Sequence, residues 1–197
     1  MKITKISQQI KNENRANIYI DGRYCFSLTI SQLLDSRIKL NNEIDEVQLT
    51  VFKKISQDGK LKIRTLEWLM LRPRSQKELY DYLYRKKLDA EDVELWIKEF
   101  KTKGYQNDES FTSWWIEQRR NKKRSAKFIK SELRTKGIKS EIIDNALATS
   151  LIDDKSALNE LIAKKRLLPK YQDDKKLIEY LMRQGYHYSL IKEVLAE

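Results

Sequence analysis

Residues 125–147 read SAKFIKSELRTKGIKSEIIDNAL, and this stretch decides the fold because related stretches begin at Ser75 and Asp173. Aligned on these starting positions, the three copies are fifty and then forty-eight residues apart. Apolar residues then fall into step: Leu79, Ile129 and Leu177; Leu83, Leu133 and Leu181; Val93, Ile143 and Ile191. A repeat of this length indicates supersecondary units that stack on one another to complete their cores.

Each copy is predicted to contain three helices. In the second copy, Ser125 is a suitable N-cap, since its hydroxyl can accept a hydrogen bond from a first-turn N–H. Apolar residues at helical spacing follow it, and Gly137 stands where a left-handed residue ends a helix. A further helix is expected before the cap, over residues 108–120. In the first copy, Ser75 and Glu78 predict a capping box.

The first sixty residues have a different pattern. Asp21 and Gly22 lie between alternating apolar runs, which predicts a β-hairpin with a two-residue turn. Residues 3–10 are expected to add a strand, because two strands alone are marginal in water. Helices are expected over residues 31–38 and 45–57, the second ended by Asp58 and Gly59.

These patterns predict a mainly α protein: a tandem array of three three-helix, helix-turn-helix-like repeats after a small N-terminal β-hairpin and helix extension. The expected boundaries are 1–60 for the extension and 61–106, 107–152 and 153–197 for the repeats.

Composition argues against an enzyme and against a membrane protein. His187 is the single histidine and Cys25 the single cysteine, which excludes a histidine-based metal site and an internal disulfide. None of the five glycines forms a phosphate-cradling loop. Neither a membrane span of about 20 apolar residues nor a signal-peptide core is present. We therefore expect a cytoplasmic protein with no catalytic residues, metal or cofactor.

The formal net charge is +11, and its placement is uneven. Residues 119–139 contain ten basic residues and one acid, Glu132. Such a window attracts phosphate backbones or an acidic protein groove, although a solvated helix face would carry such residues too. The candidate contacts for nucleic acid or a filament are Arg72, Arg74, Arg85, Lys86, Lys87, Arg119, Arg120, Lys122, Lys123, Arg124, Lys127, Lys130, Arg134 and Lys136.

Basic residues recur in the turn before each cap. A third, weaker set before Asp173 comprises Lys164, Lys165, Arg166 and Lys170. If equivalent turns lie along one side of a stacked array, they would form a basic track. The adjacent Trp114 and Trp115 cannot both face one core, so we expect one of them to be half exposed or to lie between repeats.

Several segments resemble the RecX family of bacterial recombination regulators. Residues 72–79 (RPRSQKEL), with Tyr82-Leu83 and Arg85-Lys86, look like that family's opening repeat. Residues 104–111 (GYQNDESF) resemble its junction between first and second repeats, and residues 129–138 (IKSELRTKGI) resemble its second repeat. The order and spacing of these segments carry the resemblance over about residues 61–197, and the N-terminal hairpin is similar to an extension of some members.

The resemblance implies an elongated, curved array that binds the RecA recombinase filament on single- or double-stranded DNA. It further implies inhibition of strand exchange, ATP hydrolysis and co-protease activity, and thus a role in DNA repair, recombination and the SOS response. The residues themselves leave two alternatives open: a helix-turn-helix-type protein that binds DNA directly, and a helical scaffold for an acidic protein. We expect a monomer, since no sustained heptad seam for dimerisation is present.

Overall fold

The computed structural model describes residues 1–150, 152–171 and 173–196. The chain divides into two compact units, residues 1–68 and 69–197. Within the described residues the first unit holds a three-stranded sheet, and the second unit is helical.

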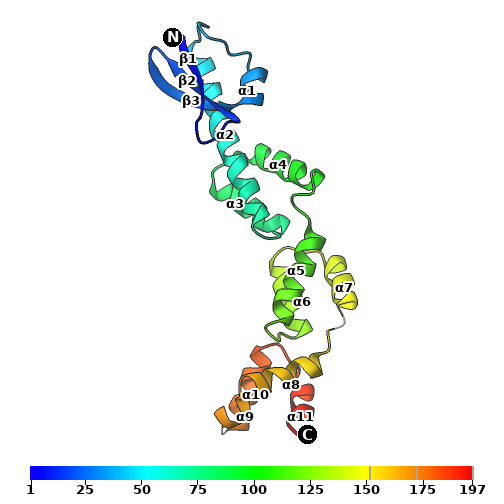
Figure 1. The fold of residues 1–197 in the computed structure, drawn as a ribbon. Helices are drawn as coiled ribbons and strands as arrows, with labels where there is room; N and C mark the ends of the chain where they lie inside the picture. Colours follow the sequence, from blue (N-terminus) through cyan, green and yellow to red (C-terminus); the bar gives the residue numbers. More distant parts are fainter. Residues whose placement is uncertain (151, 172, 197) are drawn as a thin grey trace. The chain divides into compact units, whose positions relative to one another are not determined.

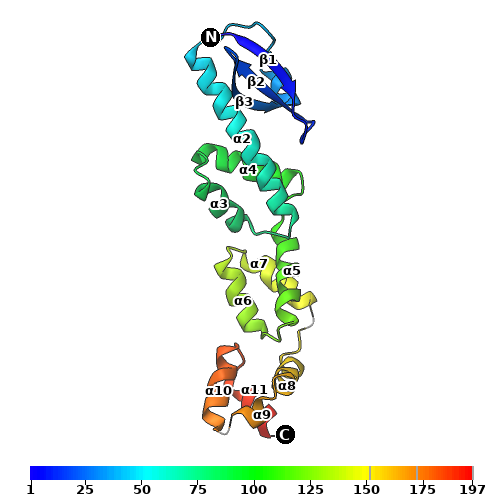
Figure 2. The same ribbon diagram turned by 60° about the vertical axis from the view of Figure 1, so that its left-hand side comes forward.

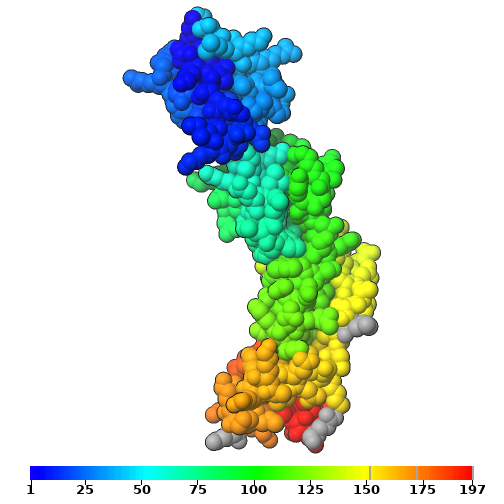
Figure 3. Space-filling model, in the orientation of Figure 1, coloured from blue at the N-terminus to red at the C-terminus, as the bar shows by residue number. Residues whose placement is uncertain are grey.

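The sheet of the first unit is antiparallel, in the order β1-β2-β3. Its strands are β1 (Ile3–Gln8), β2 (Arg15–Ile20) and β3 (Arg23–Thr29). Asp21 and Gly22 both have positive φ, 46° and 79°, as a two-residue hairpin turn matched to strand twist requires. The predicted hairpin and third strand are therefore confirmed. Figure 3 shows β1, in dark blue, open on the surface, consistent with its place at the sheet edge.

Two helices follow the sheet, α1 (Ile30–Asp35) and α2 (Glu46–Met70). Thr29 and Gln32 form a capping box at the start of α1, which sequence analysis did not predict. Phe52 and Ile55 of α2 pack on the sheet core around Ile18, and Figures 1 and 2 both show α2 beside the sheet. Helix α2 thus covers the apolar face of the sheet, and a small sheet needs such packing to be stable.

The predicted end of the second helix at Asp58 and Gly59 is wrong, because α2 continues to Met70. Gly59 is buried inside the helix, and a Cβ there would meet the Gln32 side chain at 2.6 Å. Glycine thus allows α1 to approach α2. Residues 61–70, expected to begin the first repeat, are the end of α2 rather than a separate helix.

The second unit contains helices that follow the predicted repeats. They are α3 (Gln76–Arg85), α4 (Ala90–Thr102), α5 (Asp108–Arg120), α6 (Ala126–Thr135), α7 (Ser140–Thr149), α8 (Asp154–Lys164), α9 (Leu167–Lys170), α10 (Asp174–Arg183) and α11 (Tyr188–Ala196). One buried cluster joins α5, α6 and α7, and another joins α8 to α11; Figure 1 draws these as two successive groups.

Both the caps and the core positions of the repeat alignment are confirmed. Ser75 and Ser125 accept hydrogen bonds from the third residue of α3 and α6, and Asp173 caps α10. Leu83, Leu133 and Leu181 are all completely buried. The equivalent residues Leu79, Ile129 and Leu177 are also buried.

One local prediction in this unit needs correction. Ser75 caps α3, but the Glu78 side chain does not return to the cap; it binds Arg72 and Lys136 instead. Between α8 and α10 the chain adds the short helix α9, which contains Pro169 and follows Arg166 in a left-handed conformation.

Candidate nucleic-acid and filament interface

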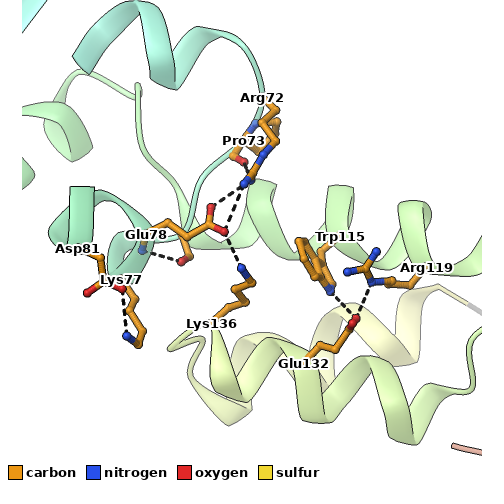
Figure 4. Close-up of polar contacts among 10 residues, drawn as sticks. Arg72, Pro73, Lys77, Glu78, Asp81, Trp115, Arg119, Glu132 and Lys136 are labelled. Carbon is orange, nitrogen blue, oxygen red and sulfur yellow. Dashed lines mark hydrogen bonds and ion pairs between the residues drawn. The ribbon is translucent and has the colours of Figure 1, made fainter. Parts of the chain in front are cut away.

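Glu78 binds two of the predicted basic residues where α3 meets α6, a place we call the first junction. Its carboxylate accepts from Arg72 Nη1 at 3.0 Å and from Lys136 Nζ at 2.8 Å. Lys136 is the C-cap residue of α6, so this carboxylate links the first repeat to the second (Figure 4). Arg72 and Lys136 therefore have a structural role within the chain.

Burial of Glu78 by itself raises the pKa of this carboxyl group. The hydrogen bonds and positive charges of Arg72 and Lys136 outweigh that effect, and the pKa lies below its ordinary value. Only 15% of the Glu78 side chain is exposed. The carboxylate is consequently ionised at neutral pH and holds both cations.

A second network lies within the second repeat. Trp115 Nε1 and Arg119 Nε both donate to Glu132 Oε2, at 3.0 and 2.5 Å (Figure 4). The Arg119 guanidinium lies 4.1 Å from the centre of the Trp115 ring, and Lys136 Nζ lies 5.0 Å from it. An aromatic face attracts cations at such distances. Arg119 therefore binds both Glu132 and the Trp115 ring within the fold.

The two adjacent tryptophans divide as expected. Trp115 is buried, with 9% exposed, and belongs to the core of α5–α7. Trp114 is half-buried, and the Arg72 guanidinium lies 5.1 Å from the centre of its ring. Since Arg72 precedes α3 and Trp114 lies on α5, Trp114 contacts both repeats.

The turn between α5 and α6 meets the third repeat at a second junction. The Tyr186 hydroxyl donates to the backbone carbonyl of Lys123 at 2.9 Å, and Lys123 has a positive φ of 53°. Burial raises the pKa of Tyr186 well above its usual range, so the hydroxyl keeps its proton and remains a donor. Lys123 Nζ forms an ion pair with Glu160 of α8.

Arg124 lies at the same junction. Its guanidinium lies 4.5 Å from the centre of the Phe128 ring and donates to the side-chain oxygen of Gln184. In the second repeat, Lys130 forms an ion pair with Asp144. Arg74 is half-buried. Its pKa is lowered mainly by desolvation and, to a smaller extent, by the positive charge of Arg72.

The structure leaves the other predicted contacts on the surface. The exposed side chains are Arg85, Lys86, Lys87, Arg120, Lys122, Lys127 and Arg134. Lys86 Nζ also lies 5.5 Å from the centre of the Tyr82 ring. Of the predicted set, these residues are the most available to a partner.

Two aspects of this site are not predicted by the sequence patterns. Glu78 was assigned to a cap, whereas its partner Lys136 is fifty-eight residues away and could be found only from the packing of two repeats. Lys164 and Lys165 are not among the predicted contacts, yet they line one cavity with Lys122 and Arg124. Their recurrence in the turn before the third cap was the signal that could have included them.

Comparison with known proteins assigns the family. A family model described as "RecX, second three-helix domain" matches residues 107–147, and one described as "Regulatory protein RecX N-terminal domain" matches residues 1–45. A Clostridium tetani protein named "Regulatory protein RecX" is 31% identical over 201 residues, covering 98% of this chain and 93% of the relative. The chain belongs to the RecX family.

Other RecX proteins agree with this assignment. The RecX protein of Oceanobacillus iheyensis is 28% identical over 207 residues, which cover 100% of this chain and 76% of the relative. A solved structure described as "Crystal structure of regulatory protein RecX" is 26% identical, with a TM-score of 0.70, and covers 100% of this chain and 99% of that one. The resemblance to RecX and the mainly helical fold with a small N-terminal β-element are thus confirmed.

Two further findings concern the described residues. None of their helices has the length and apolar character needed to cross a membrane. Nor do they contain a group of three or more His, Cys, Asp or Glu side chains that could hold a metal ion.

Proposed function

We propose that this RecX-family protein binds the RecA recombinase filament on DNA and inhibits its strand exchange, ATP hydrolysis and co-protease activities. The observation that carries the proposal is the similarity to regulatory RecX proteins over nearly the whole chain. We further propose that the protein acts in the cytoplasm as a monomer and catalyses no reaction itself. Its role would lie in recombination, DNA repair and the SOS response.

The surface charge supports a polyanionic partner. Arg120, Lys122 and Lys127 are exposed around the turn that joins α5 to α6, and Arg134 is exposed further along α6. Exposed cations gathered on neighbouring elements raise the local concentration of a phosphate-bearing partner and speed association. We place the main filament contact on this turn and on α6, with Arg85, Lys86 and Lys87 as a second contact.

A second candidate is direct binding to DNA without RecA. The same exposed cations favour it, since phosphate contacts supply most non-specific DNA affinity. In that case the helix-turn-helix-like repeats would coat single- or double-stranded DNA and leave the recombinase itself unaffected.

Co-sedimentation separates the two candidates. RecA filaments are assembled on single-stranded DNA, and the protein is spun with filaments, with DNA alone and with RecA alone. The proposal predicts that the protein enters the pellet with filaments at salt concentrations at which bare DNA no longer retains it. Equal retention by bare DNA and by filaments would favour the second candidate.

A further inference from the structure

The two junctions between repeats share the same backbone contact. At the first junction, Asp108 Oδ1 accepts a hydrogen bond from the Gln76 backbone N–H at 2.8 Å. At the second junction, Asp154 Oδ1 accepts one from the Ala126 backbone N–H at 2.9 Å. Each acid lies at the start of a repeat's first helix and binds the first residue of α3 or α6. Side chains at equivalent positions can therefore be compared directly.

The two junctions differ in charge. Glu78 lies between Arg72 and Lys136 at the first junction. In the repeat alignment, Phe128 stands at the position of Glu78 and Gln184 at that of Lys136.

Neither replacement at the second junction is charged. Phe128 offers its ring and Gln184 its amide oxygen to Arg124. In the repeat alignment Arg124 stands at the position of Arg74, and Lys122 at that of Arg72. The second junction thus keeps the cations of the turn but has no carboxylate at the position that neutralises the first junction.

A cavity of about 400 Å³ opens at the second junction, and we call it the junction cleft. Its cations come from two basic sets that are forty residues apart in sequence. They are Lys122, Lys123 and Arg124 of the α5–α6 turn, and Lys164 and Lys165 at the end of α8. None of the described residues that line the cleft is acidic.

Some cations of the cleft already have a partner within the chain. Lys123 is paired with Glu160, and Lys165 Nζ donates to the Tyr180 hydroxyl at 2.9 Å. Lys122 and Lys164 are exposed and form no ion pair with a described acid. A neighbouring cavity of about 300 Å³ is lined by Arg120, Lys123 and Arg124, but also by Asp153 and Glu160. The two acids offset most of its positive charge, so it is a poorer anion site.

We propose that the junction cleft binds the backbone phosphates of a nucleic-acid strand. Several cations converge on one concavity, where their fields add and solvent screening is weaker. A backbone phosphate offers charged oxygens that can meet an arginine fork and a lysine at once. Successive phosphates also repeat this charge at close, regular spacing along a strand, which suits a row of cations. The inference rests on the proposed function only in taking DNA as the nucleic acid encountered.

Charge reversal of the two exposed lysines tests the cleft. The variant Lys122→Glu/Lys164→Glu is compared with Lys98→Glu/Lys192→Glu, which changes the net charge equally at exposed positions outside the cleft. Binding of the full chain to a fluorescein-labelled single-stranded oligonucleotide is followed by anisotropy over a salt series, without RecA. Circular dichroism checks that each variant is folded.

We expect the cleft variant to bind on the order of tenfold more weakly than its control at low salt. Its slope of log affinity against log salt should fall by about 1.4, corresponding to about 0.7 for each of two lost contacts on a single strand. Equal weakening of both variants would overturn the inference, because it would assign the effect to net charge alone. An acidic peptide provides the comparison ligand. If the protein bound this peptide more tightly than DNA, and the Lys122→Glu/Lys164→Glu variant no longer did so, the choice of phosphate would be overturned.

Phe128→Glu provides an independent test, because it places the carboxylate of the first junction at the second. It is compatible with the repeat, since Glu78 occupies the equivalent position of α3. The new acid should pair with Arg124 and weaken DNA binding by several-fold, while Lys98→Gln, which lowers the net charge by the same single unit outside the cleft, should not. Unchanged affinity in a folded Phe128→Glu protein would overturn the inference. Because neither test contains RecA, both outcomes are independent of whether the protein inhibits the recombinase.

Discussion

Two glycines with the same left-handed backbone have different surroundings. Gly185 has φ 98° and Gly104 φ 74°. A Cβ on Gly185 would lie 2.4 Å from Ser125 Oγ and 2.6 Å from Phe128 Cβ, whereas a Cβ on Gly104 would have nothing within 4 Å. The glycine of the third repeat thus serves both its own turn and the contact with the second repeat.

Alanine at these two positions should separate backbone strain from packing. Gly104→Ala should cost about 1 kcal/mol in unfolding free energy, from the positive φ alone. Gly185→Ala should cost about 1–3 kcal/mol more, because the second junction has to shift. Urea denaturation of both variants measures the difference, and equal costs would contradict the close contact at the second junction.

The three equivalent core leucines allow a test of the repeat alignment. Leu83, Leu133 and Leu181 are completely buried, so truncation of any one to alanine should lower the unfolding free energy by about 2–5 kcal/mol. Urea denaturation monitored by tryptophan fluorescence and circular dichroism gives the values. Leu168→Ala is a suitable control, since this leucine is 58% exposed and should lose little. A loss below about 1 kcal/mol at two of the three core positions would contradict the packing.

Single residues also show which features the sequence could predict. Caps such as Ser125 and core positions such as Leu133 depend on neighbours within one repeat, and local spacing was enough to find them. The partners of Glu78 depend on how one repeat packs on the next, which helical periodicity does not specify. For the same reason, the two basic sets of the junction cleft looked like separate features.

At the scale of elements, Glu78 couples α3 to the end of α6. Its folded-state pKa is lowered relative to the unfolded value of about 4.3. A depressed carboxyl pKa contributes stability that is fully present above the unfolded pKa and is lost as pH falls through the folded pKa. The coupling is therefore complete at neutral pH and disappears under acid conditions below about pH 4.

Glu78→Gln should expose this dependence. The variant should be less stable than the parent by about 1–3 kcal/mol at pH 7, because two charged hydrogen bonds are weakened. The difference should shrink as the pH falls below about 4, where the parent carboxylate itself takes up a proton. Urea denaturation of both proteins between pH 7 and pH 3 measures it, and a gap that stays constant over that range would exclude ionised Glu78 as the cause.

Helix α2 shows where an element-level rule failed. Gly59 was interpreted as a helix end because glycine often follows the last helical residue. Here the glycine lies in the middle of α2, where the missing Cβ accommodates Gln32, whose amide donates to the carbonyl of Ile55 at 3.2 Å. The tertiary contact with α1 decided the conformation, and sequence spacing contains no information about it.

At the scale of the whole molecule, the proposal requires the repeats to act together. Linked weak contacts gain from effective concentration, and exposed cations occur in both the first and the second repeat. A chain ending at Ile152 keeps most of these cations but loses Lys164 and Lys165, which are two of the five cations of the junction cleft. It should still bind filaments, yet inhibit RecA several-fold less per mole.

A dose series of RecA ATP hydrolysis with the shortened chain measures this loss, after circular dichroism has established that the chain is folded. A second truncation that removes residues 1–59 is the comparison, and it should have the smaller effect. Full potency of the chain ending at Ile152 would contradict cooperation among the repeats. Complete loss of inhibition without residues 1–59 would show that the N-terminal unit takes part in the contact.

The repeat architecture was the most predictable property of the molecule, because its signal is repeated three times along the chain. The charge pattern predicts a polyanionic partner. Of the predicted contacts, Arg119, Lys130 and Lys136 each bind an acid of the same chain in the structure. Which cations remain available depends on acids brought close by folding, and only the structure supplies that information.

ATP hydrolysis by RecA on single-stranded DNA, with residues 1–197 added in increasing amounts, tests the central claim most directly. RecA, DNA and ATP are held constant, and the Lys122→Glu/Lys164→Glu and Lys98→Glu/Lys192→Glu variants are titrated alongside. The account predicts that hydrolysis falls with dose for the parent and the control variant, and falls much less for the cleft variant. Hydrolysis that stays unchanged at a saturating dose of the folded parent protein would contradict it.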